Sequence, residues 1–375
     1  GDGPRPDAWP LFDCRLTHDA AGGDRSVVHL CVSLFIMDGI SDLTLRRQLS
    51  ALYDDIEAPL PTPQLLYKDY CLSLEGLNGS AGLAASAEYQ ASRAFWWQRV
   101  RELPPPPQLP LAAADGEAPR ATGRFDHLGG VLSAAQLSQL RANCAAAGVT
   151  PTAVMLTIYS AVLSRYARRG DFMLNILHCL RHPVHPDVTS VIGNFSSSFL
   201  LAADVRAPVG FVDLVRTMTA ELTADLEHTT ISGVEVMEEY NRVHGSSGGA
   251  VAPFVFVSAM GLEHALTDWR QLNFTETYVE EATPGSWVVN AVKEYPDGRL
   301  MWLLEVQRGL FPEEVVKGLV SSYERLLHTL CSEPASWGEK VAELLPEGAT
   351  PTAAVERPRL PAPVAVEVAA TADAP

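Results

Sequence analysis

A run of prolines between Leu103 and Leu111 places the strongest constraint on how this chain can fold. Five of its nine residues are proline, four of them consecutive. Proline lacks a backbone N–H and holds φ at about −65°, so this segment cannot form a helix and favours a stiff, extended conformation. The run therefore predicts a crossover between two lobes. We expect a first lobe with the crossover over residues 1–111, a second lobe over 112–344, and a linker or disordered tail over 345–375.

The hydrophobic pattern on both sides of this run alternates between strands and helices. Ser26–Met37 is rich in β-branched and apolar residues, which is typical of a buried strand, and the polar residues after it open a helix. The other expected helices lie at about 86–100, between Ser133 and Gly148, from Thr150 onward, around 214–226 and around 316–330; the other expected strands lie at 171–180, 199–205, 254–258, 287–294 and 300–306. This alternation predicts an α/β fold.

The charge balance narrows the possible partners. The chain has 45 acidic and 28 basic residues, a formal net charge of −17, whereas a nucleic-acid-binding protein needs a clustered excess of lysine and arginine. No apolar run approaches the roughly 18–20 residues of a membrane-spanning helix. The six cysteines lie far apart without a CxxC pair, which favours reduced thiols. We therefore expect a cytoplasmic protein that binds neither nucleic acid nor membrane.

Polar residues follow the first predicted strand in the segment Ser33–Ser41. Side chains at a strand-to-helix junction can point into a cleft, which makes Asp38 and Ser41 candidates for a functional site. The alternative is a plain helix start, with Ser41 as the cap and Asp38 in the turn before it. The residue types alone leave both interpretations open.

Short motifs follow one another along the chain in a fixed order. They are WPLFD at 9–13, KDY at 68–70, FWxxRV at 95–100, the proline run, FMLN at 172–175, RHPVHPDV at 181–188, IGNFSS at 192–197, DLEH at 225–228, SGVEV at 232–236, PFVFVS at 253–258, TP and W at 283–287, and LFP at 310–312. Together they resemble the heterocyclization branch of the condensation-domain superfamily of nonribosomal peptide synthetases. The resemblance covers about residues 8–345.

This resemblance implies a two-lobed, chloramphenicol-acetyltransferase-like α/β fold. Its tunnel between the lobes would receive two substrates on the phosphopantetheine arms of carrier proteins. The resemblance also implies an incomplete first lobe, because family members carry an opening helix and strands before WPLFD. The domain itself would bind no metal and no nucleotide. Its partners would be carrier proteins and neighbouring synthetase domains, with an adenylation domain after the tail.

The chain departs from the family pattern at three positions. The family signature reads Asp-x4-Asp-x2-Ser, and Ser33, Asp38 and Ser41 stand at its places, so the first aspartate is replaced. In the family, cyclodehydration is attributed to a threonine and an aspartate, whose places are held here by Val257 and Val289. Valine neither donates nor accepts a hydrogen bond. The resemblance therefore implies that ring closure by the usual route is lost.

Positions linked to amide formation resemble Asn175 and Ser232, and both retain polar side chains. From the residues alone, Asn175 can simply alternate within a strand, and Ser232 can cap a helix. The resemblance implies an acyl transferase that joins a donor thioester to a cysteine, serine or threonine acceptor. The alternative is a catalytically silent docking or scaffold domain. An ordinary condensation domain is disfavoured, because no histidine stands at Ser33 or Leu34.

Three histidines with a nearby aspartate have a spacing that suggests a metal site. They are His178, His182 and His185, followed by Asp187. Two prolines within this stretch exclude a helix that would bring the imidazoles together, and the stretch belongs to the RHPVHPDV motif. We therefore expect no metal there.

Overall fold

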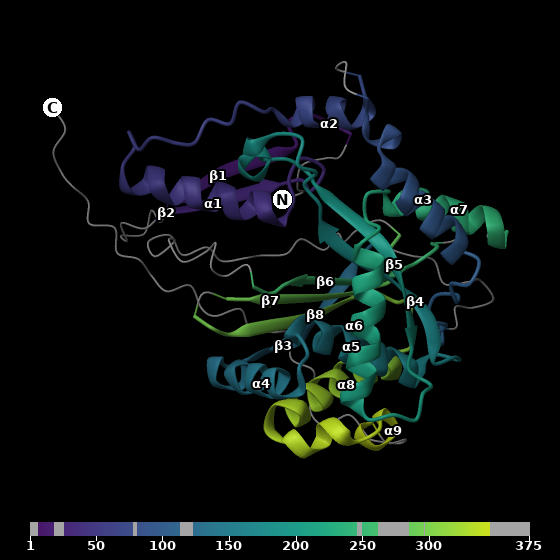
Figure 1. Ribbon diagram of the computed structural model, residues 1–375. Coiled ribbons are helices and arrows are strands. Elements are labelled where there is room, and N and C mark those ends of the chain that lie inside the picture. The colour runs from purple at the N-terminus through teal and green to yellow at the C-terminus, as the bar shows by residue number, and fades with distance from the viewer. Residues whose placement is uncertain are drawn as a thin grey trace.

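A six-stranded mixed sheet forms the centre of the second lobe (Figure 1). The computed structural model describes residues 7–18, 26–77, 81–112, 123–245, 250–261, 285–295 and 297–345. The strand order across the sheet is β3 (Phe125–Leu132), β8 (Leu300–Gln307), β7 (Val288–Glu294), β6 (Phe254–Ala259), β4 (Asp171–Cys179) and β5 (Ser196–Asp204). Strand β6 pairs in parallel with β4 and β7, and the other pairs are antiparallel.

Helices cover one face of this sheet and form the main core with it. They are α4 (Ala134–Ala147), α5 (Pro151–Tyr166), α6 (Phe211–Leu226) and α8 (Glu313–Ser332). Trp302 of β8 stacks on Tyr323 of α8 at 4.6 Å between ring centroids, and the Tyr323 hydroxyl donates to Asn290 Oδ1 of β7 at 3.1 Å. The even-numbered side chains of β7 and β8 thus face the helices. The odd-numbered side chains lie on the opposite face, which is turned toward the first lobe and is called the first-lobe face below (Figure 1).

The first lobe is built from a hairpin and two helices. Strands β1 (Phe12–His18) and β2 (Ser26–Val32) pair antiparallel, and α1 (Gly39–Asp54) and α2 (Tyr67–Glu75) follow. The prediction of a buried strand over residues 26–37 was wrong in its length and its burial. Within the described residues β2 pairs with β1 alone, so side chains such as Val28 remain 64% exposed. The short β1 and α2 were not predicted.

Helices α3 (Ala87–Arg99) and α7 (Gly233–His244) pack together at one end of the sheet (Figure 1). Trp96 of α3 is fully buried in the main core, and its indole N–H donates to the carbonyl of His228 at 2.9 Å. Short helical segments complete the chain at η1 (Leu83–Ala85), η2 (Pro186–Ser190), η4 (Pro334–Gly338) and α9 (Val341–Leu344). The predicted tail lies outside the described residues apart from Leu345.

The proline run forms neither helix nor strand in the structure, and its role as a crossover between lobes stays a prediction. Leu103 and Leu109 anchor it in the core. Its carbonyls accept hydrogen bonds from the second lobe: that of Pro105 from the Met173 N–H, and that of Gln108 from the Arg168 N–H, both at 3.1 Å. Proline removes a donor but keeps this acceptor, so the run can be fixed against a neighbouring strand without forming a helix.

Among the described residues, no single helix is long and apolar enough to cross a membrane. Helices α4 and α5 pass that test of length and composition only as a pair, bent by 96° between them.

Candidate active site

Asp38 lies where the two lobes meet and caps helix α1. It is 1% exposed, and its Oδ1 accepts a hydrogen bond from the Ser41 N–H at 2.7 Å. Its Oδ2 accepts from the Phe195 N–H at 3.3 Å, and Arg181 donates to Oδ1 at 3.2 Å. Both carboxylate oxygens are therefore engaged, and a buried guanidinium balances the charge. The cap is Asp38, rather than Ser41 as the helix-start interpretation expected.

The Ser41 hydroxyl ties the same helix to the loop after β4. It donates to the Gly193 carbonyl at 2.8 Å and accepts from the Gly193 N–H at 3.1 Å. Arg181 donates to this hydroxyl at 3.0 Å and also to two backbone carbonyls of the loop, both at 2.7 Å. The guanidinium lies over the Phe195 ring, 3.8 Å from its centroid. Asp38 and Ser41, at the last two positions of the signature, therefore join the two lobes.

Ser33, which replaces the first signature aspartate, lies in the turn after β2. Its hydroxyl accepts a hydrogen bond from the Phe35 N–H at 3.3 Å, and its own N–H donates to the Leu11 carbonyl at 2.9 Å. These contacts shape the turn between β2 and α1.

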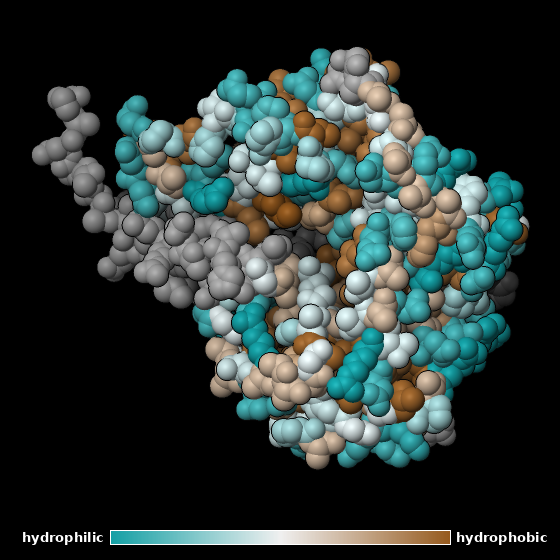
Figure 2. All heavy atoms as spheres, in the orientation of Figure 1, coloured by the Kyte–Doolittle hydropathy of each residue, from teal (hydrophilic) through white to brown (hydrophobic). Residues whose placement is uncertain are grey.

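A row of paired residues crosses the first-lobe face of the sheet. The cross-sheet row runs from β4 to β3 through Asn175, Val255, Val289, Glu305 and His127, each the strand partner of the next. Paired residues point to the same face, so the predicted residues Asn175 and Val289 lie on one surface. The space-filling view shows the molecule hollowed between the first lobe and the second (Figure 2). The row lies on the first-lobe face of the sheet.

Asn175 carries a buried polar atom that no described residue satisfies. Among the described residues, none donates a hydrogen bond to its Oδ1. Buried polar atoms are normally paired, and this exception lies on the face of the sheet that is turned toward the other lobe. Val257 lies on the same face, two residues beyond Val255 of the row. With Val289, which is 5% exposed, it makes the surface beside Asn175 apolar.

Ser232 caps helix α7 above the same face. Its hydroxyl accepts from the Glu235 N–H at 3.2 Å and donates to Glu235 Oε1 at 3.1 Å. Tyr89 of α3 donates to the other oxygen of that carboxylate. Gly233 packs so closely on Ser198 of β5 that an added Cβ would lie 2.3 Å from the Ser198 carbonyl oxygen. Since Ser198 is the strand partner of Leu177, α7 begins beside the part of β4 that follows Asn175.

Glu305 is the residue of this surface that sequence reasoning missed. Burial raises the pKa of its carboxyl to about 7. His127 Nε2 lies 3.6 Å from Glu305 Oε1, and the two side chains remain 23% and 17% exposed. In the sequence, Glu305 is the lone acidic residue of the apolar run Leu300–Val306. Such a residue predicts a buried carboxyl that either has a functional role or pairs with another group.

The three histidines weighed as metal ligands do not assemble. His185 Nδ1 accepts a hydrogen bond from the Asp187 N–H at 3.1 Å and so caps η2. Burial lowers the pKa of His178 and of His182. Within the described part of the chain, no group of three or more His, Cys, Asp or Glu side chains is placed to hold a metal ion. His264 and Asp268, whose HxxxD spacing copies that of acyltransferases but was not expected to be catalytic, lie outside the described residues.

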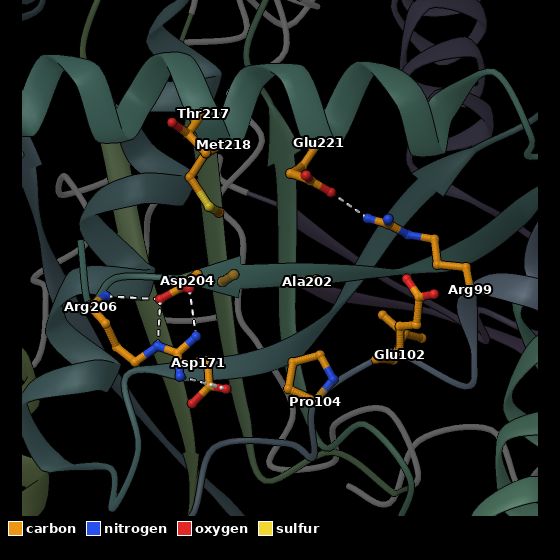
Figure 3. A pocket seen from close by; sticks show the side chains of 12 residues that line it. Arg99, Glu102, Pro104, Asp171, Ala202, Asp204, Arg206, Thr217, Met218 and Glu221 are labelled. Atoms are coloured by element: carbon orange, nitrogen blue, oxygen red, sulfur yellow. Dashed lines mark hydrogen bonds and ion pairs between the residues drawn. The ribbon is translucent and has the colours of Figure 1, made fainter.

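A separate pocket of about 290 Å³ opens at the edge of the sheet, between β5, α6 and the start of the crossover (Figure 3). Its two arginines each pair with acidic side chains of the lining. Arg206 binds Asp204 at 2.7 Å and Asp171 at 3.2 Å, and Arg99 binds Glu221 at 2.6 Å (Figure 3). The residues predicted for the active site are not among those that line it. We therefore locate the candidate site on the cross-sheet row.

Fold and site together define a two-lobed α/β domain of the chloramphenicol-acetyltransferase type, with its polar candidate residues on the sheet face between the lobes. The family model for the condensation domain matches residues 28–349. The chain therefore belongs to the condensation-domain family, and the expected fold is confirmed.

The similar proteins include synthetases and a cyclization domain of a nonribosomal peptide synthetase. Pyochelin synthetase PchF of Pseudomonas aeruginosa is 28% identical over 88% of this chain and 18% of its own length. Phenyloxazoline synthase MbtB of Mycobacterium sp. (strain MCS) is 30% identical over 84% of this chain and 26% of its own. The chain thus spans about a quarter or less of these relatives. The crystal structure of the EpoB cyclization–docking bidomain from Sorangium cellulosum has a TM-score of 0.74 at 29% identity, and covers 88% of this chain and 64% of that one.

Proposed function

We propose that this chain joins a carrier-bound donor acyl thioester to a carrier-bound acceptor amino acid of the cysteine, serine or threonine type. The acceptor amine attacks the thioester carbonyl carbon, the carbon–sulfur bond breaks, and an amide and a free thiol result. Both substrates arrive on phosphopantetheine arms, so the domain contributes position rather than a cofactor of its own. Carrier proteins and neighbouring synthetase domains are its partners, with an adenylation domain after the tail.

The observation that carries this proposal is the unsatisfied Oδ1 of Asn175. This oxygen accepts a hydrogen bond from the acceptor amine, which holds the amine on the first-lobe face and leaves its lone pair directed away from the sheet. Ser232 acts indirectly, because its hydroxyl is already bonded to Glu235 and holds the start of α7 in place.

We propose further that the amide is not closed into a ring by the family's usual route. Closure and loss of water require proton transfer beside the new amide. The two positions that supply it in the family are Val257 and Val289 here, and both lie on the apolar part of the first-lobe face. An open-chain amide is the product that this surface favours.

A catalytically silent scaffold domain is the second candidate. The side chains of Asp38, Ser41 and Ser232 already form hydrogen bonds within the protein. This favours a structural role for all three residues. A scaffold would keep the lobes together and present surfaces to carriers without turning over substrate.

Reconstitution with separately loaded carrier proteins tests both candidates. The chain is mixed with an acyl-loaded donor carrier and a seryl- or cysteinyl-loaded acceptor carrier, and the mass of the acceptor-bound product is measured. We expect the amide, without loss of a further water. A mass lower by one water would refute the loss of ring closure, and the absence of any amide would favour the scaffold. The Asn175→Ala variant is expected to slow amide formation about 10- to 100-fold, as loss of one positioning hydrogen bond does.

A further inference from the structure

Glu305 lies on the same face of the sheet as Asn175. The two residues belong to the same cross-sheet row and are separated by β6 and β7. Three strand spacings of about 4.8 Å place their Cα atoms roughly 14 Å apart. Only Val255 and Val289 lie between them in the row. Both valines are buried, with 4% and 5% of their surface exposed, so the residues between the two polar side chains are apolar and covered.

A small amino acid fits this separation. Suppose its amine donates to Asn175 Oδ1, and its side-chain oxygen or sulfur bonds to the Glu305 carboxyl. Two hydrogen bonds of about 3 Å each and the roughly 3 Å between the nitrogen and the side-chain oxygen of serine span about 9 Å, which leaves about 5 Å of the separation for the asparagine and glutamate side chains. An alanine acceptor would place a methyl group against the carboxyl and leave it without this partner. Asn175 and Glu305 are therefore spaced to bind the two ends of a hydroxyl- or thiol-bearing amino acid.

The surroundings of Glu305 suit a group that recognises a neutral hydroxyl or thiol. On the first-lobe face, the neighbours of Glu305 along β8 are Leu303 and Gln307, and on β7 it pairs with Val289. On the flanking strands, the titratable or charged side chains of the described first-lobe face are His127 of β3 and Lys293 near the far end of β7. Burial raises the pKa of Glu305, so near neutral pH a large fraction of the carboxyl carries its proton. A protonated carboxyl can both donate and accept, and this matches a hydroxyl or thiol.

We infer that Glu305 is the residue that selects a cysteine, serine or threonine acceptor, by hydrogen bonding to the acceptor side chain while Asn175 holds its amine. The inference rests on the proposed function for the presence of an acceptor on this face. It adds the residue that distinguishes that acceptor from alanine.

Equilibrium binding tests the inference without requiring turnover. Seryl and alanyl amides of aminopantetheine, which cannot transfer their acyl group, are titrated into the chain by calorimetry. We expect the seryl amide to bind about tenfold more tightly, the contribution of one hydrogen bond. Glu305→Leu should remove this preference, whereas Glu305→Gln, which can still form a hydrogen bond, should retain most of it. Glu324→Leu, at an exposed position of α8 on the other side of the sheet, is the matched control and should bind like the wild type.

Equal affinities for the two amides in the wild type, or an unchanged preference in Glu305→Leu, would refute the selection role. Failure of the proposed function has a different result: the wild type would bind the seryl and alanyl amides with different affinities but would form no product from loaded carriers. A loss of binding to both amides in Glu305→Leu would show a structural role instead and would also contradict the inference.

The pH dependence of folding provides a second, independent measurement. The pKa of Glu305 is raised from 4.5 to about 7 in the folded chain, so the folded state holds a proton that the unfolded state releases between these values. Relative to Glu305→Gln, the stability of the wild type should therefore fall as pH rises from about 4.5 to 7. If the difference in stability between the wild type and Glu305→Gln stays constant from about pH 4.5 to 7, the carboxyl is exposed to water and is not in the buried site that the inference requires.

Discussion

At the scale of single residues, the guanidinium of Arg181 organises the contact between the lobes. It is 7% exposed and bonds to a carboxylate and a hydroxyl of α1 as well as to two carbonyls of its own loop. A buried charge is costly unless it is paired, and here four acceptors pair with the two terminal nitrogens, while Nε has no hydrogen-bond partner among the described residues. Two positions of the signature motif therefore serve the assembly of the domain, although the residue types alone were equally compatible with chemistry.

Removal of the Asp38 carboxylate should destabilise the fold strongly. Asp38→Ala leaves Arg181 buried without its anion and removes the cap of α1, so we expect a loss of about 3 kcal/mol or more. Urea unfolding followed by circular dichroism measures it. Asp42→Asn is the matched control on the same helix, because its ion pair with Arg46 is partly exposed and contributes about 0.5 kcal/mol or less. Equal effects of the two substitutions would contradict the role given to Asp38.

At the scale of elements, caps and prolines made most helices predictable. Ser86 caps α3, Ser133 and Gln136 form the capping box of α4, and Thr150 caps α5 with Pro151 in its first turn. These signals are local, so one sequence suffices to find them. The end of α4 at Gly148, which adopts φ of 68°, was predictable for the same reason.

Elements that depend on distant partners were not predictable in the same way. Strand β3 contains Gly129 and Gly130 and has little β-propensity, yet it pairs along its whole length with β8. An added Cβ at Gly129 would lie 2.1 Å from the Trp302 carbonyl oxygen, so close approach explains that glycine. In the candidate site, Asn175 was found through its motif. Glu305 was not, because its position beside Val289 exists only after β7 and β8 pair.

The start of α7 offers a test of whether Ser232 acts through its hydroxyl or through its cap. Asparagine is as good a cap as serine but lacks the hydroxyl. We expect Ser232→Asn to keep the free energy of unfolding within a few tenths of a kcal/mol, and Ser232→Ala to lose about 1 kcal/mol. In both variants, the rate of amide formation should fall only where the free energy of unfolding falls. A large fall in rate for Ser232→Asn at unchanged stability would instead assign the hydroxyl a direct role.

At the scale of the whole molecule, one glycine decides how closely the lobes approach. Gly193 accepts a hydrogen bond from the Asp38 N–H at 3.1 Å and exchanges two with the Ser41 hydroxyl. Tyr67 of α2 packs against it, and an added Cβ would lie 2.1 Å from the Tyr67 ring. Both helices of the first lobe therefore rest on this single backbone position in the second.

Gly193→Ala should loosen the first lobe without unfolding the second. The methyl group forces the Tyr67 ring away, which costs about 1–3 kcal/mol as overpacking does and weakens the contacts of α1 and α2. Limited proteolysis should then cut faster between these helices, within residues 55–66, while fragments of the second lobe persist. Gly39→Ala, where the added Cβ meets no atom within 4 Å, is the control. Equal cleavage rates in the two variants would argue against Gly193 as the point of attachment.

The order of strands in the sheet also has a consequence for how the chain is made. Strand β3 pairs with β8, so that Phe125 lies opposite Gln307, 182 residues later in the chain. In a growing polypeptide, β3 therefore remains unpaired until nearly the whole second lobe has been synthesised. Pairings between such distant segments are slow and leave strand edges exposed in the meantime. The surface that brings Asn175, Glu305 and His127 together should thus be among the last parts to form on the ribosome.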